Sequence, residues 1–212
     1  MKVCRFAPFL LTAALLTACS TPSTDRSAGP PSAATDSSDA PPLAPMDTTA
    51  ASATNVHSDT LKAVRTRHLF SSPSAPDLFQ LVLRGDSLLG GEATFTITAA
   101  DGTVIFREAL SSADLEASMV YEMNKPDATR QEREAFLRRR MGEFFAPKNF
   151  HQPAIDPKAT YQPGTVDRVV WDDLRKRNGT VSFQYLVGKE DGRRIAWSPL
   201  RRQVVRIGGF GG

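Results

Sequence analysis

A short segment in which apolar and polar residues strictly alternate places the strongest constraint on the fold of this chain. Residues 92–98, EATFTIT, carry apolar side chains at every second position and threonines between them. A period of two is typical of a strand with one buried face and one solvated face. Asp101 and Gly102 follow, and glycine accepts the positive φ of a tight turn. With the return strand at 103–110, the pattern predicts an antiparallel β-hairpin.

Similar patterns lie on both sides of this hairpin and enclose a helical segment. Residues 78–84 place Phe79, Leu81 and Leu83 on one face and predict the strand that precedes the hairpin. Thr129 and Glu132 have the spacing of a capping box, which marks the start of a helix, and Pro147 ends that helix. Two other helices are indicated by apolar residues three and four positions apart. The expected helices cover 113–123, 129–146 and 165–177, and the later strands cover 181–187, 194–198 and 203–207.

The order of these elements predicts an α+β fold. Strands grouped before and after a block of helices, in the order βββ-ααα-βββ, favour α+β over a parallel α/β arrangement. We expect one antiparallel sheet of five or six strands with the helices packed on one face. Residues 58–207 have the length of a single globular domain, and residues 208–212 are expected to form a flexible Gly-rich tail.

The N-terminus has the zones of a secretory signal. Lys2 and Arg5 precede an apolar run over residues 6–16. This run is shorter than the roughly 20 residues needed to span a bilayer, which is typical of an exported leader. Cleavage by the general signal peptidase is one interpretation. The run ends in Leu16-Thr17-Ala18-Cys19, which resembles the lipobox of bacterial lipoproteins, in which Leu, a small or polar residue and Ala or Gly precede Cys.

The resemblance implies a lipid anchor in the cell envelope. Residues 1–18 would be removed as a signal peptide, and Cys19 would carry a thioether-linked diacylglycerol and usually an amide-linked fatty acid such as palmitate. Two or more acyl chains give stable membrane attachment. Some bacteria sort lipoproteins by the residue that follows the lipidated cysteine. In these bacteria, Ser20 rather than Asp at this position favours the outer membrane over the inner membrane. Because Cys4 leaves with the leader and Cys19 is lipidated, we expect no disulfide in the mature protein.

Residues 19–57 are expected to be a disordered tether that begins at the lipidated cysteine. The segment consists mainly of Ser, Thr, Pro, Ala and Asp, and such a composition cannot offset the entropy of ordering. The proline pairs at 30–31 and 41–42 stiffen it locally. The tether is either a passive spacer or a device that lets the domain reach away from the membrane.

Few residues suggest catalysis, and no cofactor or metal is expected. The histidines are His57, His68 and His151, and their spacing does not match a metal-ligand motif. The segment 147–164 holds four prolines and should form an irregular loop. If the domain is an enzyme, its site would most plausibly use His151 and Asp156 within this loop.

Clustered arginines are a second candidate site. The chain has a formal net charge of +3, and arginine dominates its basic residues. One interpretation is ordinary surface charge with helix-end and cross-strand pairing. The other is a patch that binds an anionic lipid, lipopolysaccharide or cell-wall polymer, with binding that weakens as salt rises. Nucleic acid is excluded as a partner because the leader exports the chain. The candidate patch consists of Arg138, Arg139, Arg140, Arg193, Arg194, Arg201 and Arg202.

These observations favour a membrane-anchored envelope lipoprotein that acts as a non-enzymatic binding or structural module. Its expected partner, besides the membrane, is an envelope protein or an anionic polymer, and its oligomeric state is left open. The alternative is an envelope enzyme acting on cell wall or polysaccharide, with a site near the 147–164 loop. The stretch YLVGKEDGRRI at 185–195 resembles uncharacterised envelope lipoproteins, which implies no activity.

Overall fold

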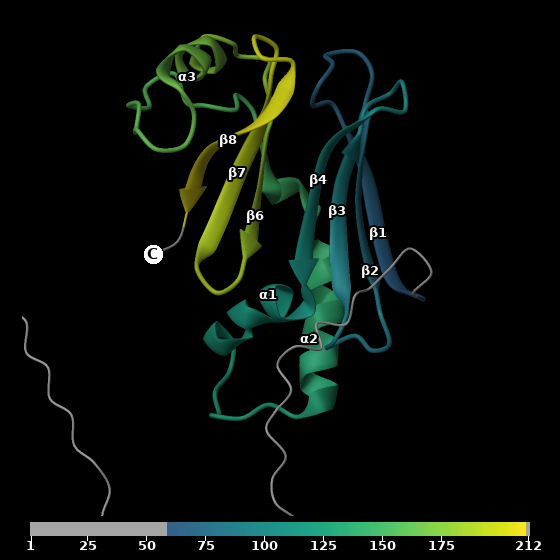
Figure 1. Ribbon diagram of the computed structural model, residues 1–212. Helices are drawn as coiled ribbons and strands as arrows, with labels where there is room; N and C mark the ends of the chain where they lie inside the picture. The colour runs from purple at the N-terminus through teal and green to yellow at the C-terminus, as the bar shows by residue number, and fades with distance from the viewer. Residues whose placement is uncertain (1–58, 211–212) are drawn as a thin grey trace, which may run out of the picture. The chain divides into compact units, whose positions relative to one another are not determined.

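Two antiparallel sheets and three α-helices make up residues 59–210, the part of the chain that the computed structural model describes (Figure 1). The α+β class expected from the sequence is confirmed. Sheet A contains β1 (Thr60–His68), β2 (Asp77–Arg84), β3 (Glu92–Thr98) and β4 (Val104–Ser111), in that spatial order. Sheet B contains β5 (Phe150–His151), β6 (Ser182–Val187), β7 (Asp191–Ser198) and β8 (Gln203–Phe210), also in that order.

Several predictions concern residues outside 59–210. The signal peptide at 1–18, the lipidated Cys19 and the tether at 19–57 all lie there, as do the last two residues of the Gly-rich tail. Within the described part, β8 continues to Phe210, three residues beyond the expected end of the last strand.

The helices are shorter than their sequence patterns suggest. The first expected helix divides into α1 (Ser112–Glu116) and a 3-10 turn, η1 (Ala117–Tyr121). The second is α2 (Arg130–Glu143), followed by the 3-10 turn η2 (Pro147–Asn149), and the third is α3 (Arg168–Arg175). Asp167 caps α3, because its carboxylate accepts a hydrogen bond from the amide of Val170 at 3.0 Å. Among the described residues, no helix is both long enough and apolar enough to cross a membrane.

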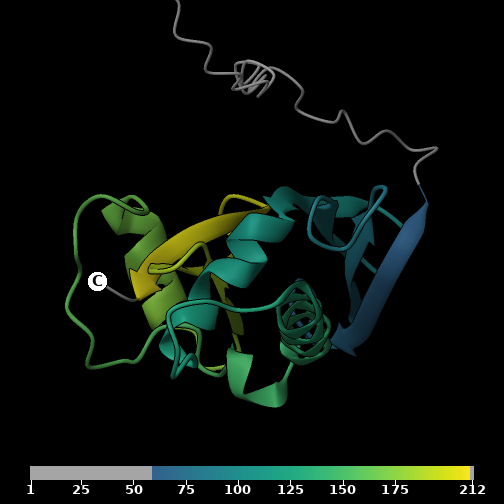
Figure 2. The ribbon, with the colours of Figure 1, turned by 90° about the horizontal axis from the view of Figure 1, so that it is seen from below.

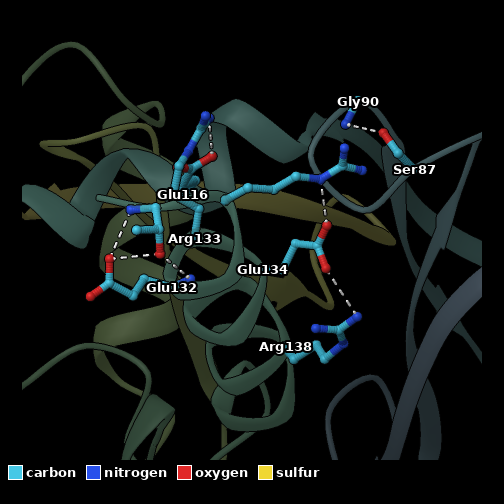
Figure 3. Close-up of polar contacts among 9 residues, drawn as sticks. Ser87, Gly90, Glu116, Glu132, Arg133, Glu134 and Arg138 are labelled. Atoms are coloured by element: carbon cyan, nitrogen blue, oxygen red, sulfur yellow. Dashed lines mark hydrogen bonds and ion pairs between the residues drawn. The ribbon is translucent and has the colours of Figure 1, made fainter. Parts of the chain in front are cut away.

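The capping box of α2 is present as predicted. The Thr129 hydroxyl accepts a hydrogen bond from the amide of Glu132 at 3.3 Å, and the Glu132 carboxylate accepts one from the amide of Thr129 at 2.7 Å. Lys125 also donates to Glu132 at 2.7 Å. Figure 3 shows Glu132 turned back to the start of the helix. These bonds satisfy amides that the first turn of a helix leaves unpaired.

The expectation of one sheet of five or six strands is wrong. The two strand clusters do not join edge to edge; instead, their side chains pack together in a shared core. The ring centroids of Phe79 on β2 and Phe183 on β6 are 5.5 Å apart, and those of Phe95 on β3 and Tyr185 on β6 are 5.4 Å apart. Burial of this aromatic cluster removes apolar surface from water and stabilises the packing of the two sheets.

The expectation that all helices pack on one face of a sheet is also wrong. Leu137 and Met141 of α2 belong to the core between the sheets. Trp171 and Leu174 of α3 instead pack with Ala196 of β7 in a second, smaller core. Figure 2 shows α3 on the side of sheet B that faces away from sheet A. Sheet B is therefore buried on both faces, whereas sheet A is buried only on the face toward sheet B and α2.

Candidate functional site

The arginines of α2 are engaged within the fold. Arg138 forms an ion pair with Glu134 at 3.4 Å (Figure 3). Arg139 pairs with Glu122 of the segment before α2, and its guanidinium lies 5.2 Å from the ring centroid of Phe136. Arg140 is half-buried, and this burial lowers the pKa of its guanidinium. Two of the three charges are thus opposed by carboxylates at close range.

Two of the arginines on β7 and in the turn that follows it also form ion pairs. Arg193 pairs with Glu108 of β4 and, at 2.8 Å, with Asp191. Arg201 pairs at 2.9 Å with Asp167, the cap of α3. Arg194 donates to Gln184 at 3.1 Å, whereas Arg202 is exposed in the turn between β7 and β8. The arginine clusters of the sequence are therefore mainly structural ion pairs, and they occupy α2, β7 and a turn.

The two residues of the candidate enzyme site are not brought together around one cavity. His151 is half-buried in β5, opposite Ser182 of β6, and lines a cavity of about 430 Å³. Asp156 is exposed and does not line that cavity. Its carboxylate accepts a hydrogen bond from the amide of Lys158 at 2.8 Å, which is turn chemistry.

A different set of arginines lies on the outer face of sheet A. Phe79, the central core residue of β2, points inward, so its neighbour Gln80 points outward. The register places Arg65 opposite Gln80, Gln80 opposite Thr96, and Thr96 opposite Arg107. These four residues form one row across β1, β2, β3 and β4, which we call the Arg65–Arg107 row.

The row carries hydrogen-bond donors and two positive charges but no carboxylate. Within residues 59–210, neither Arg65 nor Arg107 forms an ion pair, and both are exposed. Neighbouring strands are about 4.8 Å apart, so the α-carbons of the two arginines lie about 14 Å from each other. Figure 1 shows no described helix on this face of sheet A. The row is thus free to contact an anion from solvent.

A large cavity lies at the end of β1. It has a volume of about 770 Å³, and its walls come from β1, the 69–76 loop, the segment before β6 and the end of β7. The cavity of about 430 Å³ adjoins it, because both are lined by His68, Gln152 and Val181. We call the pair the His68 cleft.

His68 stands at the junction of the two cavities with a fixed orientation. Its ring stacks on Phe150 with centroids 4.1 Å apart and an interplanar angle of 2°. Its Nδ1 lies 2.9 Å from the carbonyl oxygen of Leu69. A carbonyl oxygen can only accept, so Nδ1 carries a proton, and Nε2 is an acceptor whenever the ring is in its neutral form.

The sequence contained signals for both features, although weak ones. Only the strand register joins the Arg65-Thr66-Arg67 alternation to the isolated Arg107 in one surface. In the sequence, His68 has no neighbouring residue that marks it as part of a cavity. Among residues 59–210, no group of three or more His, Cys, Asp or Glu side chains gathers to hold a metal ion.

Comparisons with protein-family models, with curated proteins and with solved structures find no match to this chain. Interpretation of the two surfaces therefore rests on the residues that form them.

Proposed function

We propose that this chain is a lipid-anchored lipoprotein of the cell envelope that binds an anionic envelope polymer through the outer face of sheet A. The observation that carries the proposal is the Arg65–Arg107 row. It combines two guanidinium groups with the amide of Gln80 and the hydroxyl of Thr96, and no carboxylate lies in the row to neutralise them. The module acts by binding rather than by catalysis.

The anchor in this proposal rests on the lipobox at residues 16–19. Lipid on Cys19 would hold the protein at a membrane, with the outer membrane favoured by Ser20. The residues that follow, up to the start of β1, would let the domain reach a polymer away from the bilayer. A Cys19→Ala chain should leave the membrane fraction and lose incorporation of labelled fatty acid. Retained labelling would contradict lipidation at this residue.

The positive charge and the exposure of the Arg65–Arg107 row would attract a polyanion. Exposed charges interact weakly one at a time, with about 0.2–1 kcal/mol for each contact. A polymer that presents several negative charges can engage both arginines at once, so the contributions combine in one complex. Such binding must weaken with salt, because the Debye length falls to about 8 Å at physiological ionic strength.

The test is binding of the purified full chain, kept in a non-ionic detergent, to an immobilised polyuronate. Arg65→Gln combined with Arg107→Gln should weaken binding about tenfold, since two lost contacts amount to roughly 1.4 kcal/mol. Thr96→Glu should weaken it further, because it places a carboxylate between the arginines. The matched control is Arg138→Gln with Arg139→Gln, which removes the same charge from arginines that are already paired.

Two results would contradict the proposal. One is equal loss of binding in the control and in the Arg65/Arg107 variant, which would show that only net charge matters. The other is that the Arg65/Arg107 variant binds the polyuronate as tightly as the unmutated chain does at every salt concentration.

A further inference from the structure

We propose that the His68 cleft is a separate binding site for a sugar acid, meaning a pyranose ring that bears a carboxylate. The proposal goes beyond polymer binding on sheet A, because the cleft is lined by different residues, and Arg67 is the point at which the two surfaces meet.

The size of the cleft suits a small ligand. Its two parts have volumes of about 770 and 430 Å³, and sites for small molecules typically measure about 300–1,000 Å³. The parts share His68 and Gln152, so a ligand seated against His68 can extend into either one.

The imidazole of His68 offers an oriented acceptor. Stacking on Phe150 fixes the plane of the ring, and the bond from Nδ1 to Leu69 selects the tautomer of the neutral ring in which Nε2 accepts. Nε2 can therefore accept a hydrogen bond from a ligand hydroxyl without first reorganising the ring. Thr180 adds a second acceptor, because its hydroxyl proton is already donated to the carbonyl oxygen of Arg177 at 2.8 Å.

Trp197 supplies an aromatic wall. The residue is half-exposed in β7 and lines the larger part of the cleft. A pyranose ring has a face of C–H groups, and such a face can pack on an indole ring while the hydroxyls at its edge form hydrogen bonds. An aromatic wall beside oriented acceptors matches a ligand that is apolar on its face and polar at its edge.

Arg67 supplies the charge that selects an acid. Its side chain is exposed, lines the cleft, and forms no ion pair with any residue from 59 to 210. The other arginine of the cleft, Arg177, is held by Asp173 through two bonds of 2.9 Å. A ligand carboxylate would therefore pair with Arg67, where a two-pronged contact is strong and directional.

The experiment is calorimetric titration of the full chain in detergent with three probes: D-glucuronate, D-glucose and acetate. Glucuronate has both the ring and the carboxylate, and each other probe has one of them. We expect glucuronate to bind at least about tenfold more tightly than glucose or acetate. Equal binding of acetate and glucuronate would overturn the proposal, as would an absence of saturation by glucuronate at about 10 mM.

Three variants assign the roles. His68→Phe keeps a ring against Phe150 but removes Nε2, and it should weaken glucuronate binding about tenfold. Trp197→Leu should weaken glucuronate and glucose equally. Arg67→Gln should weaken glucuronate alone and bring it to the level of glucose. Unchanged affinity in all three would overturn the site.

Two further measurements separate a failure to fold from a failure to bind, and the His68 cleft from the Arg65–Arg107 row. If His68→Phe fails to fold, the Nε2 nitrogen resonance of His68 in the unmutated chain should shift when glucuronate is added, and no shift would contradict the proposal. Arg65→Gln with Arg107→Gln should leave glucuronate binding unchanged. If the unmutated chain binds glucuronate but not the polyuronate, the proposed function fails and the cleft proposal stands. If it binds the polyuronate but not glucuronate, the cleft proposal alone fails.

Discussion

Tyr185 and Glu108 are joined by a hydrogen bond that crosses from sheet B to sheet A. The hydroxyl of Tyr185 on β6 donates to the carboxylate of Glu108 on β4, and the ring is buried in the core between the sheets. Burial raises the pKa of the Tyr185 hydroxyl, which therefore remains a donor at any physiological pH. With the Arg193–Glu108 ion pair, the bond adds a directional polar contact to an interface that consists mainly of apolar side chains.

Tyr185→Phe should lower the free energy of unfolding by about 1–2 kcal/mol, because the Glu108 carboxylate loses a buried donor while it keeps its pair with Arg193. Urea unfolding followed by circular dichroism measures this change. Tyr121→Phe is the matched control: Tyr121 donates to Glu190 at 2.7 Å, but both residues are exposed. The control should change stability by less than about 0.5 kcal/mol, and an equal loss would contradict the importance of burial.

Glu132→Gln should remove part of the acid sensitivity of the domain. Hydrogen bonds from Lys125, and then from Thr129, lower the pKa of the Glu132 carboxyl from 4.5 to about 2. Because the folded-state pKa is the lower one, this group stabilises the fold fully above about pH 4.5 and progressively loses that effect as the pH falls toward 2.

Thermal unfolding at several pH values measures this effect. The Tm of Glu132→Gln should lie below that of the unmutated chain at pH 7 and converge with it near pH 2. Asp86→Asn is the control, because Asp86 is exposed and forms no ion pair with a residue from 59 to 210, so its loss should be neutral. Parallel Tm curves for Glu132→Gln and the unmutated chain would refute the prediction.

Gly192→Ala should destabilise sheet B by about 1–3 kcal/mol, because overpacking forces backbone shifts. A methyl group at Gly192 would overlap the carbonyl oxygen and the ring of Phe210 on β8. Gly142→Ala, in α2, meets no atom within 4 Å and should raise stability by about 0.5–1 kcal/mol. Chemical denaturation of the two variants checks the opposite signs, and a stabilising Gly192→Ala would show that β8 does not pair there.

Arg202→Gly should stabilise the turn between β7 and β8 by up to about 1 kcal/mol. Arg202 has a φ of 53°, in the left-handed region where a Cβ is unfavourable and glycine is not. Arg201→Gly is the comparison: it removes the ion pair with Asp167 and should destabilise. Denaturant midpoints distinguish the two, and a destabilising Arg202→Gly would mean that its side chain has a role beyond the turn.

The parts of the fold that depend on residues close together in the chain were predictable from the sequence. The hairpin forms where the alternation and Gly102 indicate, and Gly102 has a φ of 90°. The capping box of Thr129 and Glu132 forms because both partners lie within one helical turn. By contrast, β1 was not predicted, since its Lys and Arg residues resemble an exposed loop although charge is common on edge strands.

The candidate site was harder to predict because ion pairing depends on tertiary contacts. Arg201 and Asp167 are 34 residues apart in the chain and pair only after α3 packs on sheet B. Arg65 and Arg107 belong to strands at the two edges of sheet A, and only the register of all four strands places them in one row. Clustering of arginines in the sequence therefore does not show which of them form ion pairs in the fold and which stay unpaired.

The row that joins Arg65 to Arg107 sets a length scale for the proposed ligand. Hydrogen bonds between four strands hold the two α-carbons about 14 Å apart, and the backbone cannot shorten this distance without breaking the sheet. Because each exposed arginine side chain can rotate about its α-carbon, the two guanidinium groups cover a range of separations around this distance. In the proposed complex, sheet A therefore favours polymers that present at least two negative groups within this range.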